Sequence, residues 1–101
     1  MNPFLKHKIE DLKQMLKKHK VKRAYAFGSV CSENFNEQSD IDLLVRFEEG
    51  MLPEDYSDNY FNLLFTLQKY FNRNIDLVSE ASLTNPYFIS SVNRSKQLIY
   101  E

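Results

Sequence analysis

Two stretches of the chain repeat their apolar residues at the spacing of an amphipathic helix. The first covers roughly residues 3–19 and places these apolar side chains on one face: Leu5, Ile9, Leu12 and Leu16. Asn2-Pro3 in front of it combines a capping residue with proline at the first helical position. The second stripe consists of Tyr60, Leu63, Leu64, Leu67, Tyr70 and Phe71. Both stripes predict helices that pack one face against a core.

Short apolar runs between and after these helices predict strands. They cover residues 21–27, 41–47, 74–78 and 97–100. The 41–47 run, IDLLVRF, is the most apolar and is expected at the centre of a sheet. The 97–100 run is expected to form a terminal edge strand.

The remaining segments predict the connections. Residues 28–39 lack a clear period, which predicts a short helical turn followed by a loop. The acidic segment from Glu48 to Asp58 is expected to be a loop. Asn85-Pro86 repeats the cap-plus-proline signal and predicts a last helix. Its inward side chains are expected to be Phe88, Ile89 and Val92. This order of elements predicts a sheet covered by helices.

Composition limits the chain to one domain. Its 101 residues are 43% hydrophobic and include only two Gly and three Pro, which predicts a single fold over residues 1–101. Cys31 is the only cysteine, so no internal disulfide can form. Residues 1–23 are too polar for a signal peptide, and no apolar run is long enough to span a membrane. We therefore expect a reducing, cytoplasmic setting.

Charge is unevenly distributed although the net charge is −1. Residues 1–23 carry eight Lys or Arg against Glu10 and Asp11, a local net charge of +6, whereas residues 24–101 carry −7. A basic arm on an acidic body is one way to bind RNA or an acidic partner. We favour the alternative of a solvated helix face, because such clusters are common on surfaces, and we do not expect direct binding to nucleic acid.

Three aspartates interrupt the apolar strands. Asp40 and Asp42 are two residues apart at the start of a strand, so their carboxylates face the same side of the sheet. Carboxylates this close repel each other and raise one pKa unless a cation lies between them. Mg²⁺ prefers oxygen ligands and shares its coordination shell with substrate phosphates. Asp76 lies between Ile75 and Leu77 and would join the pair if the 41–47 and 74–78 strands are neighbours. The alternative is a helix-cap-like Asp40 with solvated charges at the other two positions.

Gly28-Ser29 directly follows the first predicted strand. Glycine lacks a Cβ, so its backbone can approach a phosphate closely. The amides of a following helical turn and the Ser29 hydroxyl can then hold an anion. Taken alone, such a turn is common and indicates little.

Together these residues resemble a known family. Gly28-Ser29, ten intervening residues and Asp40-Ile41-Asp42 resemble the G-S and D-x-D motif of polymerase-β-like nucleotidyltransferases. The stretch AFGSVCSENFNEQSDIDLLVRF is similar to the minimal nucleotidyltransferases called MNT proteins, and NIDLV and QLIYE match later segments of that family. The resemblance implies an α+β fold with a mixed sheet covered by helices.

The resemblance also implies roles for the site residues. Gly28 and Ser29 would bind the nucleotide, Asp40 and Asp42 would ligate Mg²⁺, and Asp76 would complete the metal site and help deprotonate the acceptor hydroxyl. The implied reaction is attack on the α-phosphorus of a nucleoside triphosphate with release of pyrophosphate. Its rate would come mostly from positioning and charge neutralisation.

The same resemblance implies a partner. MNT proteins are typically paired with HEPN proteins in toxin–antitoxin systems, where the MNT member transfers AMP from ATP to a toxin tyrosine. We therefore expect an adenylyltransferase antitoxin with a HEPN-type toxin as partner. Two alternatives stay open, an antitoxin that neutralises by binding alone and nucleotidyl transfer to a small molecule. The oligomeric state is equally open.

Overall fold

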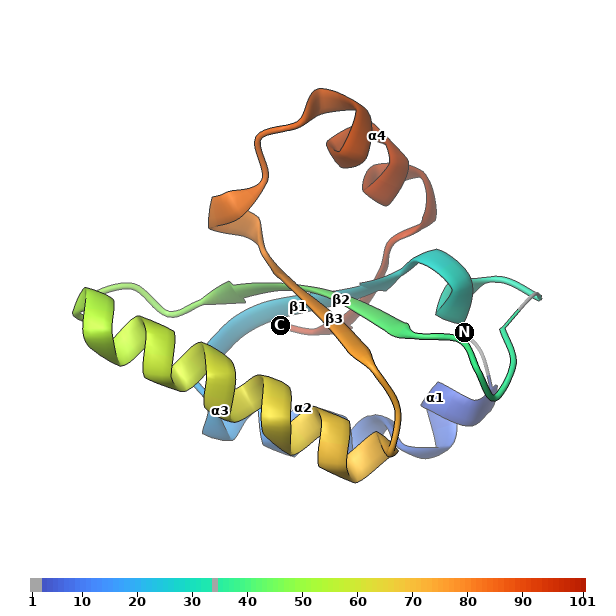
Figure 1. Cartoon of the computed structure of the whole chain (residues 1–101), viewed down its shortest axis with the longest axis horizontal. Coiled ribbons are helices and arrows are strands. Elements are labelled where there is room, and N and C mark those ends of the chain that lie inside the picture. Colours follow the sequence, from blue (N-terminus) through green and yellow to red (C-terminus); the bar gives the residue numbers. More distant parts are fainter. Residues whose placement is uncertain (1–2, 34) are drawn as a thin grey trace.

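A four-stranded mixed sheet forms the middle layer of the molecule (Figure 1). The structure, a computed structural model, describes residues 3–33 and 35–101, so the predicted cap at Asn2 lies outside the described residues. The strands are β1 (Val21–Phe27), β2 (Ile41–Phe47), β3 (Ile75–Ser79) and β4 (Gln97–Tyr100), in the order β3-β2-β1-β4. β1 is antiparallel to β2 and β4, whereas β2 and β3 are parallel. The predicted α+β fold, the inner strand over 41–47 and the edge strand over 97–100 are confirmed.

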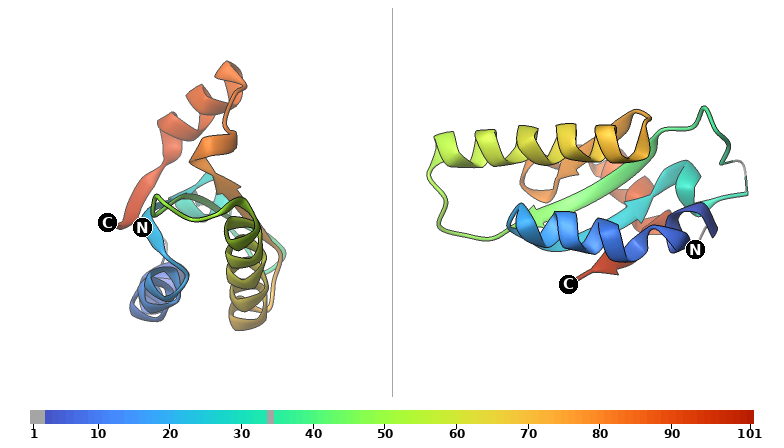
Figure 2. Two further views of the ribbon diagram at one scale, coloured as in Figure 1. Left: turned by 90° about the vertical axis from the view of Figure 1, so that its left-hand side faces the viewer. Right: turned by 90° about the horizontal axis from the view of Figure 1, so that it is seen from below.

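Helices cover both faces of this sheet. On one face lie α1 (Pro3–His7), α2 (Ile9–Lys18) and α3 (Pro53–Phe71), and Figure 2 shows α2 and α3 side by side there. On the opposite face lies α4 (Pro86–Ser95). The short 3-10 turns η1 (Gly28–Cys31) and η2 (Glu80–Ser82) follow β1 and β3. Among the described helices, none is long and apolar enough to cross a membrane.

Two predicted boundaries differ from the structure. The helix expected over residues 3–19 is interrupted at Lys8, whose amide binds the Leu5 carbonyl three residues back and tightens the turn. The loop expected up to Asp58 is wrong beyond residue 52, because α3 begins at Pro53. Proline at the first helical position and acidic residues in the first turn both favour a helix start, although the same residues resemble a loop by composition.

The core is divided between the two faces of the sheet. A large cluster of buried residues fills the space under α2 and α3 and includes Leu12, Leu16, Ile41, Leu43, Val45, Leu63 and Leu67. On the α4 face, a small cluster consists of the buried residues Phe27, Leu44 and Val92, with Phe88 packed against it. The Asn85 side chain accepts hydrogen bonds from the backbone amides of Tyr87 (2.9 Å) and Phe88 (3.3 Å), so the predicted cap of α4 is confirmed.

Candidate active site

The sheet register places two of the three aspartates directly beside each other. Asp42 of β2 pairs with Asp76 of the parallel strand β3 on one side and with Phe27 of the antiparallel strand β1 on the other. Neighbouring strands are about 4.8 Å apart, and paired residues face the same side of the sheet. The condition under which Asp76 was expected to join the pair, that its strand lies next to the 41–47 strand, is therefore met.

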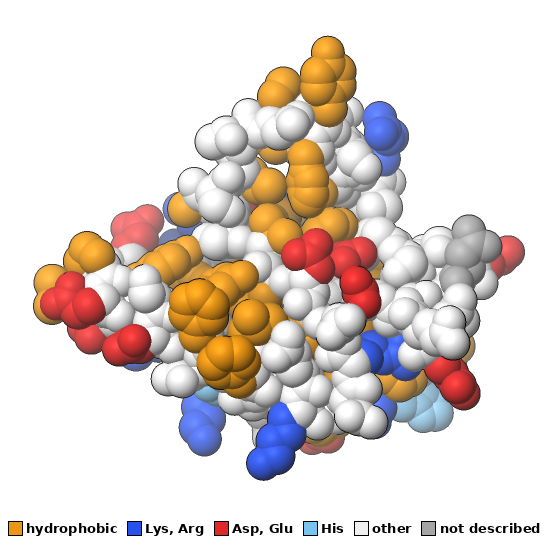
Figure 3. Space-filling view, viewed as in Figure 1, with side chains coloured by type: hydrophobic (Ala, Val, Ile, Leu, Met, Phe, Trp, Pro, Cys, Tyr) orange, Lys and Arg blue, Asp and Glu red, His pale blue; other side chains and the backbone are white. Residues whose placement is uncertain are grey.

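The alternation along β2 decides which face carries the carboxylates. Ile41, Leu43 and Val45 belong to the large cluster under α2 and α3, whereas Leu44 belongs to the cluster under α4. Asp42 shares the alternation of Leu44 and therefore faces α4. It is half-buried, while Asp40 and Asp76 are more open to solvent. Figure 3 shows acidic side chains gathered on the surface between the sheet and α4.

Gly28 brings the backbone of η1 against the Asp42 carboxylate. Its φ angle is +71°, a left-handed conformation that glycine adopts without strain. A Cβ atom at this position would lie 2.3 Å from Asp42 Oδ2, far inside van der Waals contact. Any other residue here would have to displace the Asp42 carboxylate, and the close approach of Gly28 places the Gly28-Ser29 turn next to Asp42.

Ser29 joins the two halves of the motif directly. Its hydroxyl donates a hydrogen bond to the carbonyl of Asp40 (3.3 Å). Its own carbonyl accepts both the amide and the hydroxyl of Ser32, each at 3.0 Å. The turn after β1 is therefore tied to the residue that precedes β2.

Ser95 is a site residue that the sequence analysis did not find. The Gly28 amide donates to Ser95 Oγ (3.2 Å), which links η1 to the last residue of α4. The two residues are 67 positions apart, and no local pattern around Ser95 marks it. Only the folded chain brings α4 to the glycine turn.

Burial and the neighbouring carboxylates both change the acidity of Asp42. Its pKa is raised to about 6, mainly by burial and further by the negative charges of Asp76 and Asp40. Burial and the charge of Asp76 also raise the pKa of Tyr60, whose hydroxyl donates to the Leu77 carbonyl. Over residues 3–33 and 35–101, no group of three or more His, Cys, Asp or Glu side chains is already spaced as a metal-ligand set. The three aspartates form an acidic group in which the charges of Asp76 and Asp40 act on Asp42.

Comparison with known proteins settles the family. Residues 10–101 match the family described as polymerase beta, nucleotidyltransferase. The chain belongs to this nucleotidyltransferase family. A relative from Methanocaldococcus jannaschii, named for a proposed protein adenylyltransferase activity, is 34% identical over 100 residues, which are 91% of this chain and 96% of the relative.

Solved structures agree with the assignment of this chain to the nucleotidyltransferase family. A proposed minimal nucleotidyltransferase superposes with a TM-score of 0.72 at 32% identity, covering 96% of this chain and 95% of the other. A chain from the complex of a tri-AMPylated Shewanella oneidensis HEPN toxin with its MNT antitoxin superposes with a TM-score of 0.66, covering 93% of this chain and 70% of the other. At 18% identity this second likeness shows a shared fold.

The carboxylates of this nucleotidyltransferase lie apart from the hollow at the other end of the sheet. A hollow of about 520 Å³ is lined by residues at and just after the ends of β2 and β3 and in the first turn of α3, among them Arg46, Glu49, Tyr56, Ser79 and Glu80. None of the three aspartates lines it. Asp40 and Asp76 are instead exposed on the surface, and Asp42 is half-buried.

Proposed function

We propose that this nucleotidyltransferase transfers AMP from ATP to a tyrosine of a HEPN-type toxin, with Mg²⁺ as cofactor, and acts as the antitoxin of that toxin. The observation that carries the proposal is the packing of the Gly28 backbone against Asp42, which itself pairs with Asp76. A nucleotide bound at the Gly28-Ser29 turn would have its phosphates beside all three aspartates. The name of the archaeal relative and the AMPylated toxin in the structurally similar complex support a protein acceptor.

Asp40, Asp42 and Asp76 are the residues that would hold Mg²⁺. Their oxygens are the ligands that this cation prefers, and Mg²⁺ sites commonly combine one or two carboxylates with substrate phosphates and water. The raised pKa of Asp42 supports the assignment, because burial and then the charges of Asp76 and Asp40 disfavour its carboxylate, and a bound cation would offset both effects. The chemistry that the bound ion supplies is neutralisation of charge on the phosphates and on the attacking oxygen.

The side chains and backbone of the site would carry out the remaining work. Gly28 lets the backbone approach the phosphates, and Ser29 fixes this turn to Asp40. Asp76 would accept the proton of the tyrosine hydroxyl, whose pKa of about 10 makes a base useful at neutral pH. The tyrosine oxygen forms a bond to the α-phosphorus, the bond from that phosphorus to the bridging oxygen breaks, and pyrophosphate leaves.

The open position of the aspartates favours an acceptor that is itself part of a macromolecule. Asp40 and Asp76 are both exposed, and neither lines the hollow of about 520 Å³. A small acceptor molecule would find few walls there, whereas a tyrosine held on a partner protein brings its own positioning. We therefore favour protein modification over transfer to a small molecule.

The test is co-expression with a HEPN-type toxin, followed by intact-mass measurement of the toxin after incubation with ATP and Mg²⁺. We expect AMP-sized mass increments with the wild-type protein and none with the Asp40→Asn/Asp42→Asn double variant. Asp58→Asn is the matched control, because Asp58 is exposed on α3 and outside the site. The control should leave the modification intact.

The same variants separate catalysis from inhibition by binding. If the double variant still relieves toxicity in cells without modifying the toxin, neutralisation comes from binding alone and the enzymatic role as antitoxin is wrong. If the wild-type protein modifies no toxin yet consumes ATP with a small acceptor, the substrate class is wrong. Toxicity relief that follows the mass increments supports the proposal.

A further inference from the structure

The loop in front of Asp40 is held by a side chain from outside the site. Arg73 lies between α3 and β3, and its Nη1 donates hydrogen bonds to the carbonyls of Asn36 (3.1 Å) and Ser39 (2.9 Å). A guanidinium Nη carries two hydrogens, so one nitrogen can serve both acceptors. The Ser39 carbonyl belongs to the peptide that joins Ser39 to Asp40. Arg73 therefore fixes the backbone one residue before the first aspartate.

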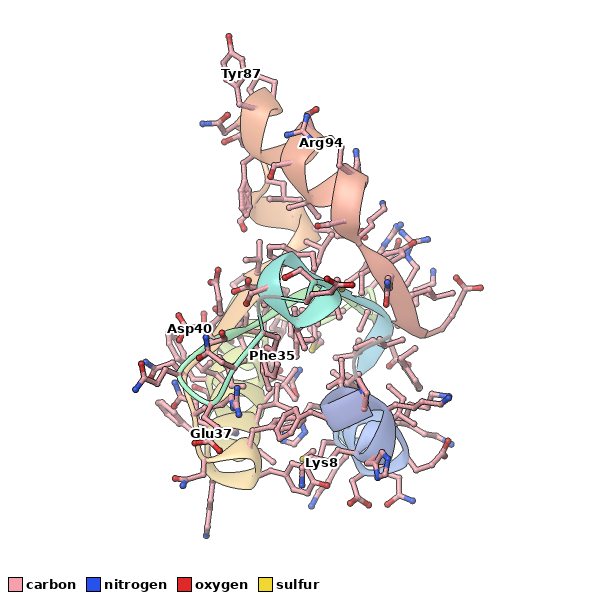
Figure 4. The ribbon with its side chains drawn as sticks, turned by 90° about the vertical axis from the view of Figure 1, so that its right-hand side faces the viewer. Lys8, Phe35, Glu37, Asp40, Tyr87 and Arg94 are labelled. Atoms are coloured by element: carbon pink, nitrogen blue, oxygen red, sulfur yellow. The ribbon has the colours of Figure 1, made fainter. Side chains whose placement is uncertain are left out.

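Two aromatic rings hold the Arg73 guanidinium in place. Its Cζ lies 4.6 Å from the ring centroid of Phe4 in α1 and 4.7 Å from that of Phe35 in the loop. Contacts of a cation with ring faces at such distances are favourable, and a planar guanidinium stacks better than an ammonium group. In Figure 4 the loop, labelled at Phe35 and Asp40, lies between η1 and the helices α1 and α3. One side chain thus anchors the loop to the N-terminal helix.

The loop is also closed by its own hydrogen bonds. The Ser39 amide donates to the Asn36 carbonyl (3.1 Å), and the Asn36 amide donates to Ser39 Oγ (3.0 Å). The Gln38 amide donates to Asn36 Oδ1 (2.8 Å). A turn closed in this way moves as a unit, so an anchor at Asn36 and Ser39 also places Asp40.

Asn74, the residue after Arg73, fixes the backbone on the other side of Asp40. The Ile41 amide, between the two aspartates of the motif, donates to the Asn74 carbonyl (3.1 Å). Asn74 is two residues before Asp76. The segment of Arg73 and Asn74 therefore sets the position of Asp40 on both sides and ties it to the strand that carries Asp76.

From these contacts we infer that Arg73 is a positioning residue that places Asp40 for metal binding, and thereby sets the Mg²⁺ concentration that ATP binding needs. The inference rests on the proposed function, because it takes Asp40 as a Mg²⁺ ligand. Arg73 acts through the backbone of the loop. Residues that orient metal ligands typically change metal affinity or activity about 10–100-fold when they are replaced.

The first test is Arg73→Lys, which keeps the positive charge but loses the planar group that reaches two carbonyls and stacks on two rings. We expect the Mg²⁺ concentration at half-maximal ATP binding, measured by calorimetry, to rise roughly 10-fold. Binding should recover at saturating Mg²⁺, which a general loss of stability would not produce. Arg94→Lys is the matched control, because Arg94 is exposed on α4 and donates to Ser90 within that helix.

The second test needs neither metal nor nucleotide. Hydrogen exchange of the metal-free protein should be faster at the amides of Ser39 and Ile41 in Arg73→Lys and unchanged in Arg94→Lys. If Arg73→Lys does not fold, Phe35→Leu removes one ring, keeps both hydrogen bonds and should show the same two effects more weakly.

The outcomes separate this inference from the proposed function. An unchanged Mg²⁺ requirement together with unchanged exchange would show that Arg73 does not place the loop, and the inference would be wrong. Faster exchange with an unchanged Mg²⁺ requirement would reduce Arg73 to a structural role and would also overturn it. A wild-type protein without any Mg²⁺-dependent ATP binding would instead overturn the proposed function, while the exchange data would still decide whether Arg73 holds the loop.

Discussion

At the scale of single residues, Gly28 couples the backbone of the fold to the chemistry of the site. Its left-handed φ of +71° is one constraint, and the 2.3 Å that would separate a Cβ atom there from Asp42 Oδ2 is a second. Gly50 provides a comparison, since its φ is +93° but a Cβ there would meet no atom of the described residues within 4 Å. The two glycines allow backbone strain to be measured apart from contact with the carboxylate.

Gly28→Ala should therefore lower the free energy of unfolding more than Gly50→Ala does. A left-handed conformation costs a residue with a Cβ about 1–2 kcal/mol, which applies to both variants. Gly28→Ala must also displace Asp42, and overpacking of this kind typically costs about 1–3 kcal/mol more. Denaturant unfolding of both variants measures the difference. Equal losses would mean that the Asp42 carboxylate moves aside freely and that Gly28 is not required by the site.

The raised pKa of Asp42 predicts how stability depends on pH. The folded protein keeps a proton on Asp42 up to a pH of about 6, whereas the unfolded chain releases it near the ordinary value of 3.8. Over that window the folded state binds more protons, so this group makes the metal-free protein less stable as the pH rises. Below the window the carboxyl is protonated in both states, and above it the loss is complete.

Asp42→Asn isolates this effect from the other groups that titrate in the same range. We expect thermal unfolding in a chelator to show a smaller loss of stability between pH 4 and pH 6, roughly the window set by the two pKa values, in Asp42→Asn than in wild type. Asp42 is only half-buried, so solvent screening keeps the difference below the roughly 1.4 kcal/mol that each pKa unit represents at full strength. Parallel pH profiles for the two proteins would contradict the raised pKa.

At the scale of elements, the strands were predictable because sequence and environment agree over their whole length. β1 and β2 occupy the predicted ranges 21–27 and 41–47, where an apolar run is bounded by polar segments. The first turn of α3 could not be predicted, because proline and acidic residues occur both in loops and at helix starts. The interruption at Lys8 has no glycine or proline to mark it, so it depends on how α1 packs rather than on local sequence.

In the candidate site, too, some features could be predicted from local sequence and others could not. Alternation predicted that Asp40 and Asp42 face one side of the sheet, whereas Asp76 was expected to join them only if its strand were a neighbour, which the pairing of β2 with β3 supplies. The contacts of Ser95 with Gly28 and of Arg73 with Ser39 join residues 67 and 34 positions apart. Such contacts follow from the path of the chain through three layers, which no local pattern contains.

At the scale of the whole molecule, the hydrophobic cores on the two faces of the sheet differ in size. The face under α2 and α3 carries the large buried cluster, whereas the α4 face is closed by Phe27, Leu44 and Val92 with a few half-buried neighbours. The aspartates face this weaker layer, and Ser95 at the end of α4 accepts the Gly28 amide. An opening of α4 would therefore free a backbone donor of the glycine turn without unfolding the strands.

Native-state hydrogen exchange should show this asymmetry as two levels of protection. We expect the amides of α4 to exchange through a local opening that costs less free energy than global unfolding, while β1 and β2 exchange only globally. Val92→Ala should speed exchange mainly in α4, because Val92 belongs to the small cluster. Leu67→Ala, in the large cluster, should destabilise the whole protein by about 2–5 kcal/mol and speed exchange in every element. If wild-type α4 were as protected as β2, or if Val92→Ala sped exchange equally everywhere, α4 would be part of one cooperative unit, and the site could not open from that side alone.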